Sequence, residues 1–566
     1  MRRSLLKAVS LNVVSQVVNA IGAVVVTAIV SRSLGPAGTG DYALATFSVL
    51  TIGSLATLGG PLVITRAIAE DGSRSDPVGL TALHRLALRW TGASTLAAFA
   101  ISAAAIAGGL AGRFSATEQL VGVLALASYI LSAYGSALLA GRQDFRRLLL
   151  VSAAGTLLQV ALASAAVVAS PDISMYLAAM AISCAFQGIA CGWIVRGCFR
   201  GRSDGVKSEE RKSLRRDVVM ISAISIVDTI VIQRTEVFVL AAVSSSREVA
   251  FFSLASALVT RTMAFLPGAV ASVMLPRFSA SQDLSAEYTV AVRWSALASI
   301  PLAAWFVVCG SLIVDVLYGA AYRSMSDVIA IIAVAAIVNC IGSVAGSAGY
   351  ATHTHRYILR IQGACAVLNC VLAIVLCRPY GAIGAASAGS IAQVVGVLTG
   401  IAILWWRVRL RTPWLAILRV LAVGAAATVI GFASKQVLGG RLGTAPELVV
   451  VTTAFFLSFG VLAVIARAVP EDESAALLGA IRGMLSARRR RTPVVLNAAD
   501  PGLVNPVGAE VIELRSVRDR ANHQGRIEPV PMPLRSVDGL RLRLELGESA
   551  DRAKTIAERY RVRKTV

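Results

Sequence analysis

The sequence predicts an all-α polytopic membrane protein with about fourteen transmembrane helices, and three observations lead to this fold class. The 566-residue chain is 56% hydrophobic and has a mean hydropathy of +0.71. Only 15% of its residues are charged, against roughly 25% in soluble proteins. The long uncharged stretches are apolar on all sides, whereas a surface helix of a soluble protein has one polar face.

The individual spans follow from length, because a helix needs about 20 apolar residues to cross the hydrocarbon core. The spans before the longest internal loop are Val9–Ile29, Ala43–Ile64, Leu86–Gly109, Leu120–Leu139, Leu148–Val168 and Met175–Val195. Those after it are Val218–Ala241, Phe251–Leu275, Val292–Ile313, Val328–Tyr350, Ile358–Cys377, Ala382–Trp405, Leu415–Val437 and Leu448–Ala466. Ser170-Pro171-Asp172 is the only separation between the fifth and sixth spans.

The distribution of Lys and Arg predicts the orientation of the chain. Basic residues are concentrated in the loops on the same side as the N-terminus, and Arg196–Asp217 is the richest of these loops. Because such loops remain on the cytoplasmic side, we expect both termini in the cytoplasm. The same rule accounts for the net charge of +22, which therefore does not indicate nucleic-acid binding.

An internal repeat divides the predicted spans into two sets of six. At an offset of 210 residues, Gly40–Ala45 aligns with Ala250–Ala255, and the loop Arg196–Asp217 lies between the sets. Repeats of this parallel kind form transporters that bind substrate between two lobes. The expected organisation is an N-lobe at residues 1–200, a C-lobe at 201–412, helices 13 and 14 at 413–467, and a basic, largely disordered cytoplasmic tail at 468–566.

Several classes of function are disfavoured by what the sequence lacks. There is no GxxxxGK[ST] loop for a nucleotide, and we expect no cofactor. His353 and His355 make at best a weak metal site. The predicted outside loops are too short to carry the catalytic groups of a glycan-transferring enzyme, so a transporter is favoured over an enzyme. A membrane scaffold that recruits enzymes through its tail remains an alternative.

Charged residues inside predicted spans mark the candidate site, because an ion at the bilayer centre costs at least a few kcal/mol. The span Val218–Ala241 contains Asp228, Arg234 and Glu236, and Arg261 lies near the middle of the next span. Two interpretations remain open. The four charges form ion pairs that hold two helices together, or they line a cavity. In the cavity, the arginines would bind an anionic substrate and the two carboxylates would couple transport to an ion or a proton.

Three further residues are candidates for substrate contact. Arg66 follows the helix-disturbing segment Gly59-Gly60-Pro61 at the inner membrane face. Two roles are open for it: it binds an anionic headgroup of the substrate, or it is an ordinary positive-inside residue. Asn12 and Gln16 share one face of the first span with Asn19. These polar groups face either another helix or the cavity.

Three segments of the sequence resemble the polysaccharide transporter family, the flippases of lipid-linked oligosaccharides. Residues 31–43 read Ser-Arg-Ser-Leu-Gly-Pro-Ala-Gly-Thr-Gly-Asp-Tyr-Ala and follow Asn12 and Ser15-Gln16. Pro379-Tyr380-Gly381-Ala382-Ile383-Gly384-Ala385-Ala386 is the second segment, and Arg234-x-Glu236 with Val249–Ala255 is the third. The resemblance covers residues 4–466 and leaves the tail without a counterpart.

The resemblance implies two six-helix lobes around a central cavity that opens alternately to the two sides. It implies a polyprenyl pyrophosphate-linked oligosaccharide as substrate, moved from the inner to the outer leaflet of a bacterial plasma membrane for surface or exopolysaccharide biosynthesis. Arg234 and Arg261 would hold the pyrophosphate. Membrane lipid, a polysaccharide polymerase and chain-length machinery are the implied partners. A multidrug and toxin extrusion type cation antiporter and a lipid II flippase are the alternatives.

Overall fold

The computed structural model describes residues 2–74, 77–107, 112–196, 235–263, 278, 283–352, 355–439 and 443–468. All regular structure in these ranges is helical, which confirms the predicted all-α fold class. Nine of the described helices are long and apolar enough to cross a membrane, so the predicted number of fourteen is not confirmed. The chain divides into two units at residues 477 and 478, and the second unit, with most of the predicted tail, lies outside the described residues.

The described helices fall into two halves and an additional pair. The first half contains α1 (Arg2–Thr57), α2 (Gly60–Arg74), α3 (Pro77–Ala107), α4 (Ala116–Gly141), α5 (Phe145–Ala169) and α6 (Ile173–Val195). The second half contains α8 (Thr235–Val243), α9 (Ser246–Met263), α11 (Leu284–Leu317), the 3-10 turn η3 (Ala320–Tyr322), α12 (Met325–Ala351) and α13 (His355–Val408). The additional pair is α14 (Trp414–Leu438) and α15 (Thr444–Ile465). The predicted residue limits of the lobes stay predictions.

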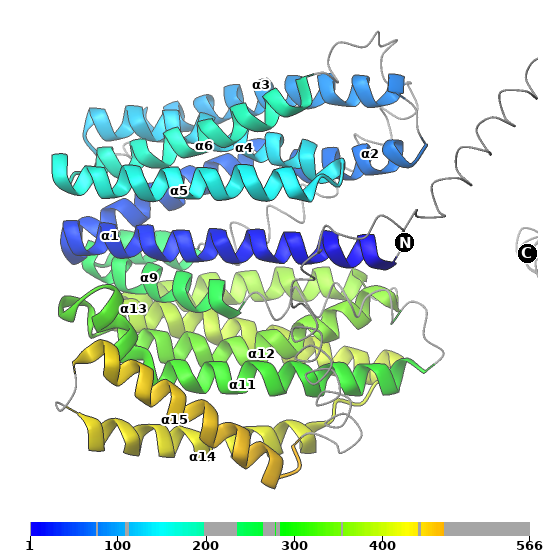
Figure 1. Ribbon diagram of the computed structural model, residues 1–566, viewed down its shortest axis with the longest axis vertical. Helices are drawn as coiled ribbons and strands as arrows, with labels where there is room; N and C mark the ends of the chain where they lie inside the picture. Colours follow the sequence, from blue (N-terminus) through cyan, green and yellow to red (C-terminus); the bar gives the residue numbers. More distant parts are fainter. Residues whose placement is uncertain are drawn as a thin grey trace, which may run out of the picture. The chain divides into compact units, whose positions relative to one another are not determined.

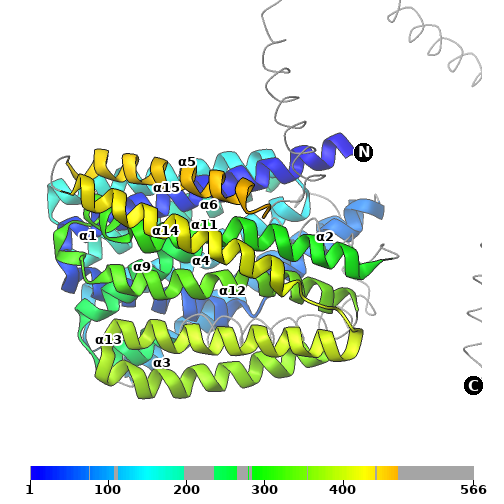
Figure 2. The ribbon, with the colours of Figure 1, turned by 90° about the horizontal axis from the view of Figure 1, so that it is seen from below.

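Two helices contain a single non-helical residue where the sequence predicted a loop or a short connection between separate spans. In α1 this residue is Gly35, with φ of 67°, and in α13 it is Gly381, with φ of 55°. Glycine adopts positive φ without steric cost, and Pro36 can resume the helix because the first helical position needs no N–H donor. Each helix therefore has two arms, and Figure 2 shows the arms of α13 side by side. A Cβ atom on Gly396 would lie 2.9 Å from Cys365 Sγ on the other arm.

Several helix ends lie where the sequence places them. The helix-disturbing segment predicted at Gly59-Gly60-Pro61 coincides with the break between α1 and α2, where Leu58 and Gly59 have positive φ. The separation predicted at Ser170-Pro171-Asp172 is also confirmed. Asp172 caps α6, because its Oδ1 accepts a hydrogen bond of 2.8 Å from the Ile173 backbone N–H.

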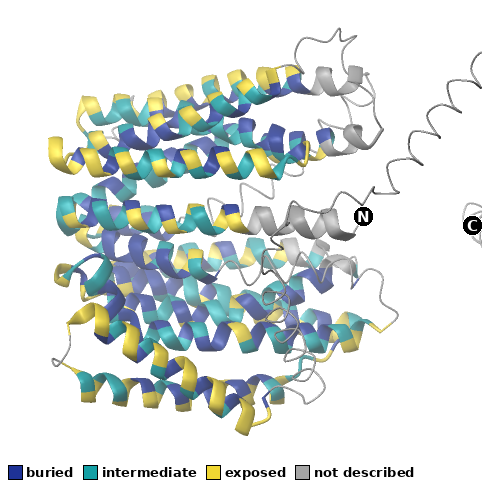
Figure 3. Cartoon of the chain, viewed as in Figure 1, coloured by how far each residue is buried: buried dark blue, intermediate teal, exposed yellow. Residues whose placement is uncertain are grey.

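The helices expose apolar side chains on the outside of the bundle, as a lipid-facing surface requires. Val168 on α5 is 88% exposed and Val464 on α15 is 76% exposed. Figure 3 shows exposed residues along the outward faces of α3, α5, α14 and α15, and buried residues toward the interior. Together with the nine long apolar helices, this surface identifies a multi-pass membrane protein.

Helix α1 packs against both halves of the chain. Figure 1 shows it between the helices of the first half and those of the second half, and it makes extensive contacts with α5 and α9. On the α5 side, the hydroxyls of Ser15 and Ser152 are 2.8 Å apart. The additional pair packs against α11, where Trp305 Nε1 donates to Thr452 Oγ1 at 3.0 Å. Contacts between the two halves therefore converge on α1.

Candidate functional site

The two halves approach each other closely where α1 crosses α9 at Gly40. A Cβ atom on Gly40 would overlap the backbone carbonyl oxygen of Ser246, so only glycine permits this approach. Beside the crossing, Ser246 Oγ donates a hydrogen bond of 2.6 Å to Asp41 Oδ1. The crossing is thus fixed both by the absence of a side chain and by a polar contact.

An arginine of the first half binds the C-terminal end of α11 in the second half. Arg32 Nε donates to the carbonyl oxygen of Leu317 at 3.0 Å, and its Nη2 donates to that of Val316 at 2.5 Å. The last carbonyl groups of a helix have no partner within the helix and carry a partial negative charge. Arg32 therefore supplies both missing donors and a complementary charge.

Tyr322 in η3 makes a third polar link between the halves. Its hydroxyl donates to the carbonyl oxygen of Ser31 at 2.9 Å and lies 2.9 Å from Thr39 Oγ1. Burial raises the pKa of the Tyr322 phenol to about 12, against the smaller opposite effect of the hydrogen bond with Thr39. The phenol therefore stays protonated at neutral pH and remains a hydrogen-bond donor.

We name these contacts the interlobe closure. It comprises Ser31, Arg32, Thr39, Gly40 and Asp41 on α1, and Ser246, Val316, Leu317 and Tyr322 on the other half. About 30 helical residues separate it from the start of α1, a distance of roughly 45 Å, so it lies at the opposite end of the first arm. With the predicted topology, that end faces the outside of the cell. The α1 segment of the closure was recognised from the sequence as part of the repeat and of the family resemblance, but its contacts were not predicted.

Arg261 lies on α9 at the boundary between the halves. Its side chain is exposed, and its guanidinium is within electrostatic range of the hydroxyls of Tyr318 and Tyr42. Tyr42 belongs to α1 in the first half, and Tyr318 follows α11 in the second. Both tyrosines are buried. Arg261 thus presents an accessible positive charge near elements of both halves.

Glu236 occupies a different place, inside the second half. The side chain is only 5% exposed, and Asn369 Nδ2 donates to its Oε1 at 2.9 Å. A Cβ atom on Gly389 would lie 2.5 Å from the same oxygen, so α8 and both arms of α13 surround the carboxyl group. Asn369 was not predicted, although an amide inside an apolar span was a signal that could have identified it.

The structure does not join Glu236 and Arg261 in an ion pair within the described ranges. Glu236 bonds to Asn369, whereas Arg261 is near the two tyrosines. Asp228 and Arg234 lie outside the described residues, so the rest of the predicted four-charge cluster stays a prediction. In the described ranges no group of three or more His, Cys, Asp or Glu residues is arranged to hold a metal ion.

The remaining candidates are distributed over α1 and α2. Arg66 is exposed on α2. Gln16 is exposed on α1, and Asn19 on the same face accepts a hydrogen bond of 2.8 Å from Thr156 Oγ1 of α5. Asn12 lies in α1, but its side chain is outside the described part of the structure. Of this polar face, Asn19 therefore contacts another helix and Gln16 remains accessible.

Comparisons with known proteins agree with this architecture. The family described as "Polysaccharide biosynthesis protein" matches residues 5–282. A solved structure described as "Lipid II flippase MurJ, inward closed conformation" matches with a TM-score of 0.59 at 13% identity, covering 82% of this chain and 99% of that one. No curated protein matches the sequence.

A second solved structure is described as an inward-facing multidrug resistance MATE family transporter of the MOP superfamily. It matches with a TM-score of 0.53 at 15% identity, covering 70% of this chain and 98% of that one. The fold is thus one that flippases and extrusion transporters share. Together with the family match, it confirms the resemblance predicted from the sequence.

Proposed function

Because this chain matches the polysaccharide biosynthesis family over residues 5–282 and has the fold of the multidrug/oligosaccharidyl-lipid/polysaccharide exporter superfamily, we propose that it is a bacterial plasma-membrane flippase. Its substrate is a polyprenyl pyrophosphate-linked oligosaccharide, moved from the inner to the outer leaflet for surface or exopolysaccharide biosynthesis. The position of Arg261 carries this proposal. A guanidinium between the halves can donate paired hydrogen bonds to a pyrophosphate, which a carboxylate cannot do.

The interlobe closure supports alternating access as the mechanism. It holds the halves together at the end remote from the N-terminus, which leaves substrate to enter from the cytoplasmic side. In the proposed cycle, the pyrophosphate binds Arg261, the closure separates, and the glycan leaves toward the outer leaflet. Arg66, Asn12 and Gln16 contribute polar contacts along the entry path, and Arg234 adds a second positive charge.

Glu236 is the proposed ion-coupling residue, together with Asp228. A carboxyl group this deeply buried binds a proton or a cation readily, because its charged form is poorly solvated. Replacing Glu236 with Gln keeps the shape of the side chain and removes its titration. We expect translocation in proteoliposomes to lose its response to imposed proton and sodium gradients.

Glu447 on α15 provides the matched control, because it is also a buried carboxyl group but lies in the additional helix pair. The Glu447→Gln variant should keep the gradient response of the unmodified protein. An unchanged response in Glu236→Gln would remove Glu236 from the coupling mechanism.

Two alternatives use the same fold. A lipid II flippase is favoured by the MurJ likeness and would carry the same pyrophosphate group. A cation antiporter of the multidrug and toxin extrusion type is less favoured, because Arg261 presents a positive charge between the halves while Glu236 is enclosed within one of them. The match to the polysaccharide biosynthesis family is the observation that favours the oligosaccharide flippase among these candidates.

Deletion of the gene in its native bacterium tests the proposed function. We expect loss of a surface polysaccharide and accumulation of its lipid-linked precursor in a form accessible only from the cytoplasmic side. Accumulation of lipid II would instead assign the protein to cell-wall synthesis. Normal precursor pools with increased sensitivity to cationic drugs would contradict the flippase proposal and support the antiporter.

A further inference from the structure

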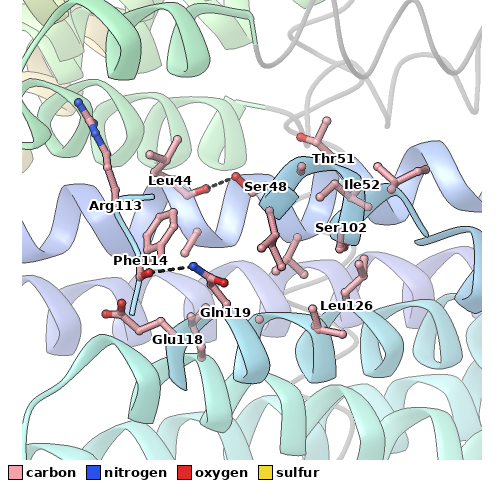
Figure 4. A pocket seen from close by; sticks show the side chains of 18 of the residues that line it. Leu44, Ser48, Thr51, Ile52, Ser102, Arg113, Phe114, Glu118, Gln119 and Leu126 are labelled. Carbon is pink, nitrogen blue, oxygen red and sulfur yellow. Dashed lines mark hydrogen bonds between the residues drawn. The ribbon is translucent and has the colours of Figure 1, made fainter. Parts of the chain in front are cut away.

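A cavity of about 680 Å³ lies beside the second arm of α1, and Arg261 is not among its lining residues. Residues of α1, α3, α4, α6 and α8 line it, together with the connection between α3 and α4. The volume is within the range of small-molecule sites, roughly 300–1,000 Å³. Figure 4 shows Arg113, Phe114, Glu118 and Gln119 at one end and Ser102, Ile52 and Leu126 toward the other. The cavity is therefore amphipathic along its length.

The polar end carries one charge of each sign. Arg113 is exposed and makes no hydrogen bond or ion pair to another residue of the described ranges. Glu118 belongs to a capping box in which its Oε2 accepts from the backbone N–H of Ser115 at 2.7 Å and from the Ser115 hydroxyl at 2.9 Å. Its Oε1 accepts no hydrogen bond from the described part of the chain. A guanidinium and a carboxylate oxygen are thus both available to a ligand.

Most of the remaining lining of the cavity is apolar, and part of it is exposed. Ile101 and Ile106 on α3 are 37% and 41% exposed, and they line the cavity together with Val49, Ile52 and Leu126. A Cβ atom on Gly122 of α4 would meet no atom within 4 Å, so the cavity continues up to the helix backbone. In a bilayer, hydrocarbon chains are the material that fills such a space.

We propose that this cavity binds a phospholipid with an amine-bearing headgroup of the phosphatidylethanolamine type. The lipid phosphate pairs with Arg113, its ammonium pairs with Glu118 Oε1, and an acyl chain occupies the space beside Gly122. The headgroup carries one charge of each sign, as the polar end of the cavity does. An anionic lipid without an amine carries no positive charge to pair with Glu118. With the predicted topology, the headgroup lies at the outer leaflet.

Native mass spectrometry of the purified full-length protein, incubated with equal amounts of phosphatidylethanolamine, phosphatidylglycerol and phosphatidylcholine, tests the proposal. We expect phosphatidylethanolamine to be retained at least several-fold more than the other two. The Glu118→Gln variant should lose this preference, because glutamine keeps the capping box but not the charge. The Arg113→Gln variant should lose retention of all three lipids.

Filling the cavity provides a test that does not depend on charge. The Gly122→Phe variant should release the retained lipid, because the phenyl ring occupies the acyl-chain space. Gly92→Phe is the matched control, since Gly92 lies exposed on α3 with no atom near its Cβ position and does not line the cavity. Equal lipid retention by the unmodified protein and Gly122→Phe would overturn the proposal. Retention of a lipid-linked sugar in place of phospholipid would also overturn it.

Discussion

Replacing Gly40 with valine is expected to stop translocation while the protein still inserts into the membrane. The added Cβ would overlap the backbone carbonyl oxygen of Ser246, and a backbone atom cannot move aside as a flexible side chain can. Overpacking of this kind costs about 3 kcal/mol or more, which lowers the population of the closed state by roughly 100-fold. The protein should therefore remain open at the interlobe closure and be unable to complete its cycle.

Spin labels at Ala37 and Ala321 measure this effect directly. Both residues are exposed, and they lie on the two sides of the closure, beside Thr39 and Tyr322. We expect a longer distance between the labels in Gly40→Val than in the unmodified protein. The Gly460→Val variant is the control, because Gly460 is exposed on α15 and its Cβ position is open. Unchanged distances together with normal translocation would show that α1 and α9 do not need this close approach.

The Arg261→Ala variant is expected to lose most of its translocation activity. The proposed role of Arg261 is to hold the pyrophosphate, and a hydrogen bond to a charged group contributes about 1.5–3 kcal/mol. Its loss should slow translocation by roughly 10–150-fold in a reconstituted flipping assay. Arg261→Lys should keep part of the activity, because lysine retains the charge but not the planar pair of donors.

Arg360→Ala serves as the control for Arg261, because Arg360 is an exposed arginine on α13 outside the contacts described above. It should translocate at the rate of the unmodified protein. Full activity of Arg261→Ala would mean that another cation binds the substrate or that the substrate is not anionic. If the Arg261→Ala variant also transported a cationic drug more slowly than the unmodified protein, Arg261 would have a structural role instead.

The sequence was sufficient to predict the fold class and many helix ends, because these depend on local composition. Apolar length predicts the spans, and Asp172 and Gly59 mark boundaries through their own chemistry. The helical conformation of the residues in Ser31–Tyr42 was not predicted, because a polar, glycine-containing segment resembles a loop until its neighbours are known. Only Gly35 interrupts it.

The site was less predictable, because its contacts join residues that are distant in the chain. Arg32 and Leu317 are 285 residues apart, and no local pattern in the sequence predicts their hydrogen bond. The charges in the predicted spans identified Glu236 and Arg261 as candidates. They did not predict that the two residues lie in different surroundings. The hydrogen bond from Asn369 likewise depends on how α13 folds back on itself.

The polar character of the interlobe closure bears on how easily it separates. Its hydrogen bonds involve the guanidinium of Arg32, the phenol of Tyr322 and the carboxylate of Asp41, all groups that water also binds well. Exchanging the bond of the Tyr322 phenol for one to water changes the free energy by only about 0.5–1.5 kcal/mol, and each bond of the charged Arg32 and Asp41 groups contributes about 1.5–3 kcal/mol. An apolar contact of the same extent would expose hydrocarbon to water on opening. When the closure opens, water can bind the separated polar groups, so opening costs little free energy. This suits a protein that must open and close once for every molecule it carries.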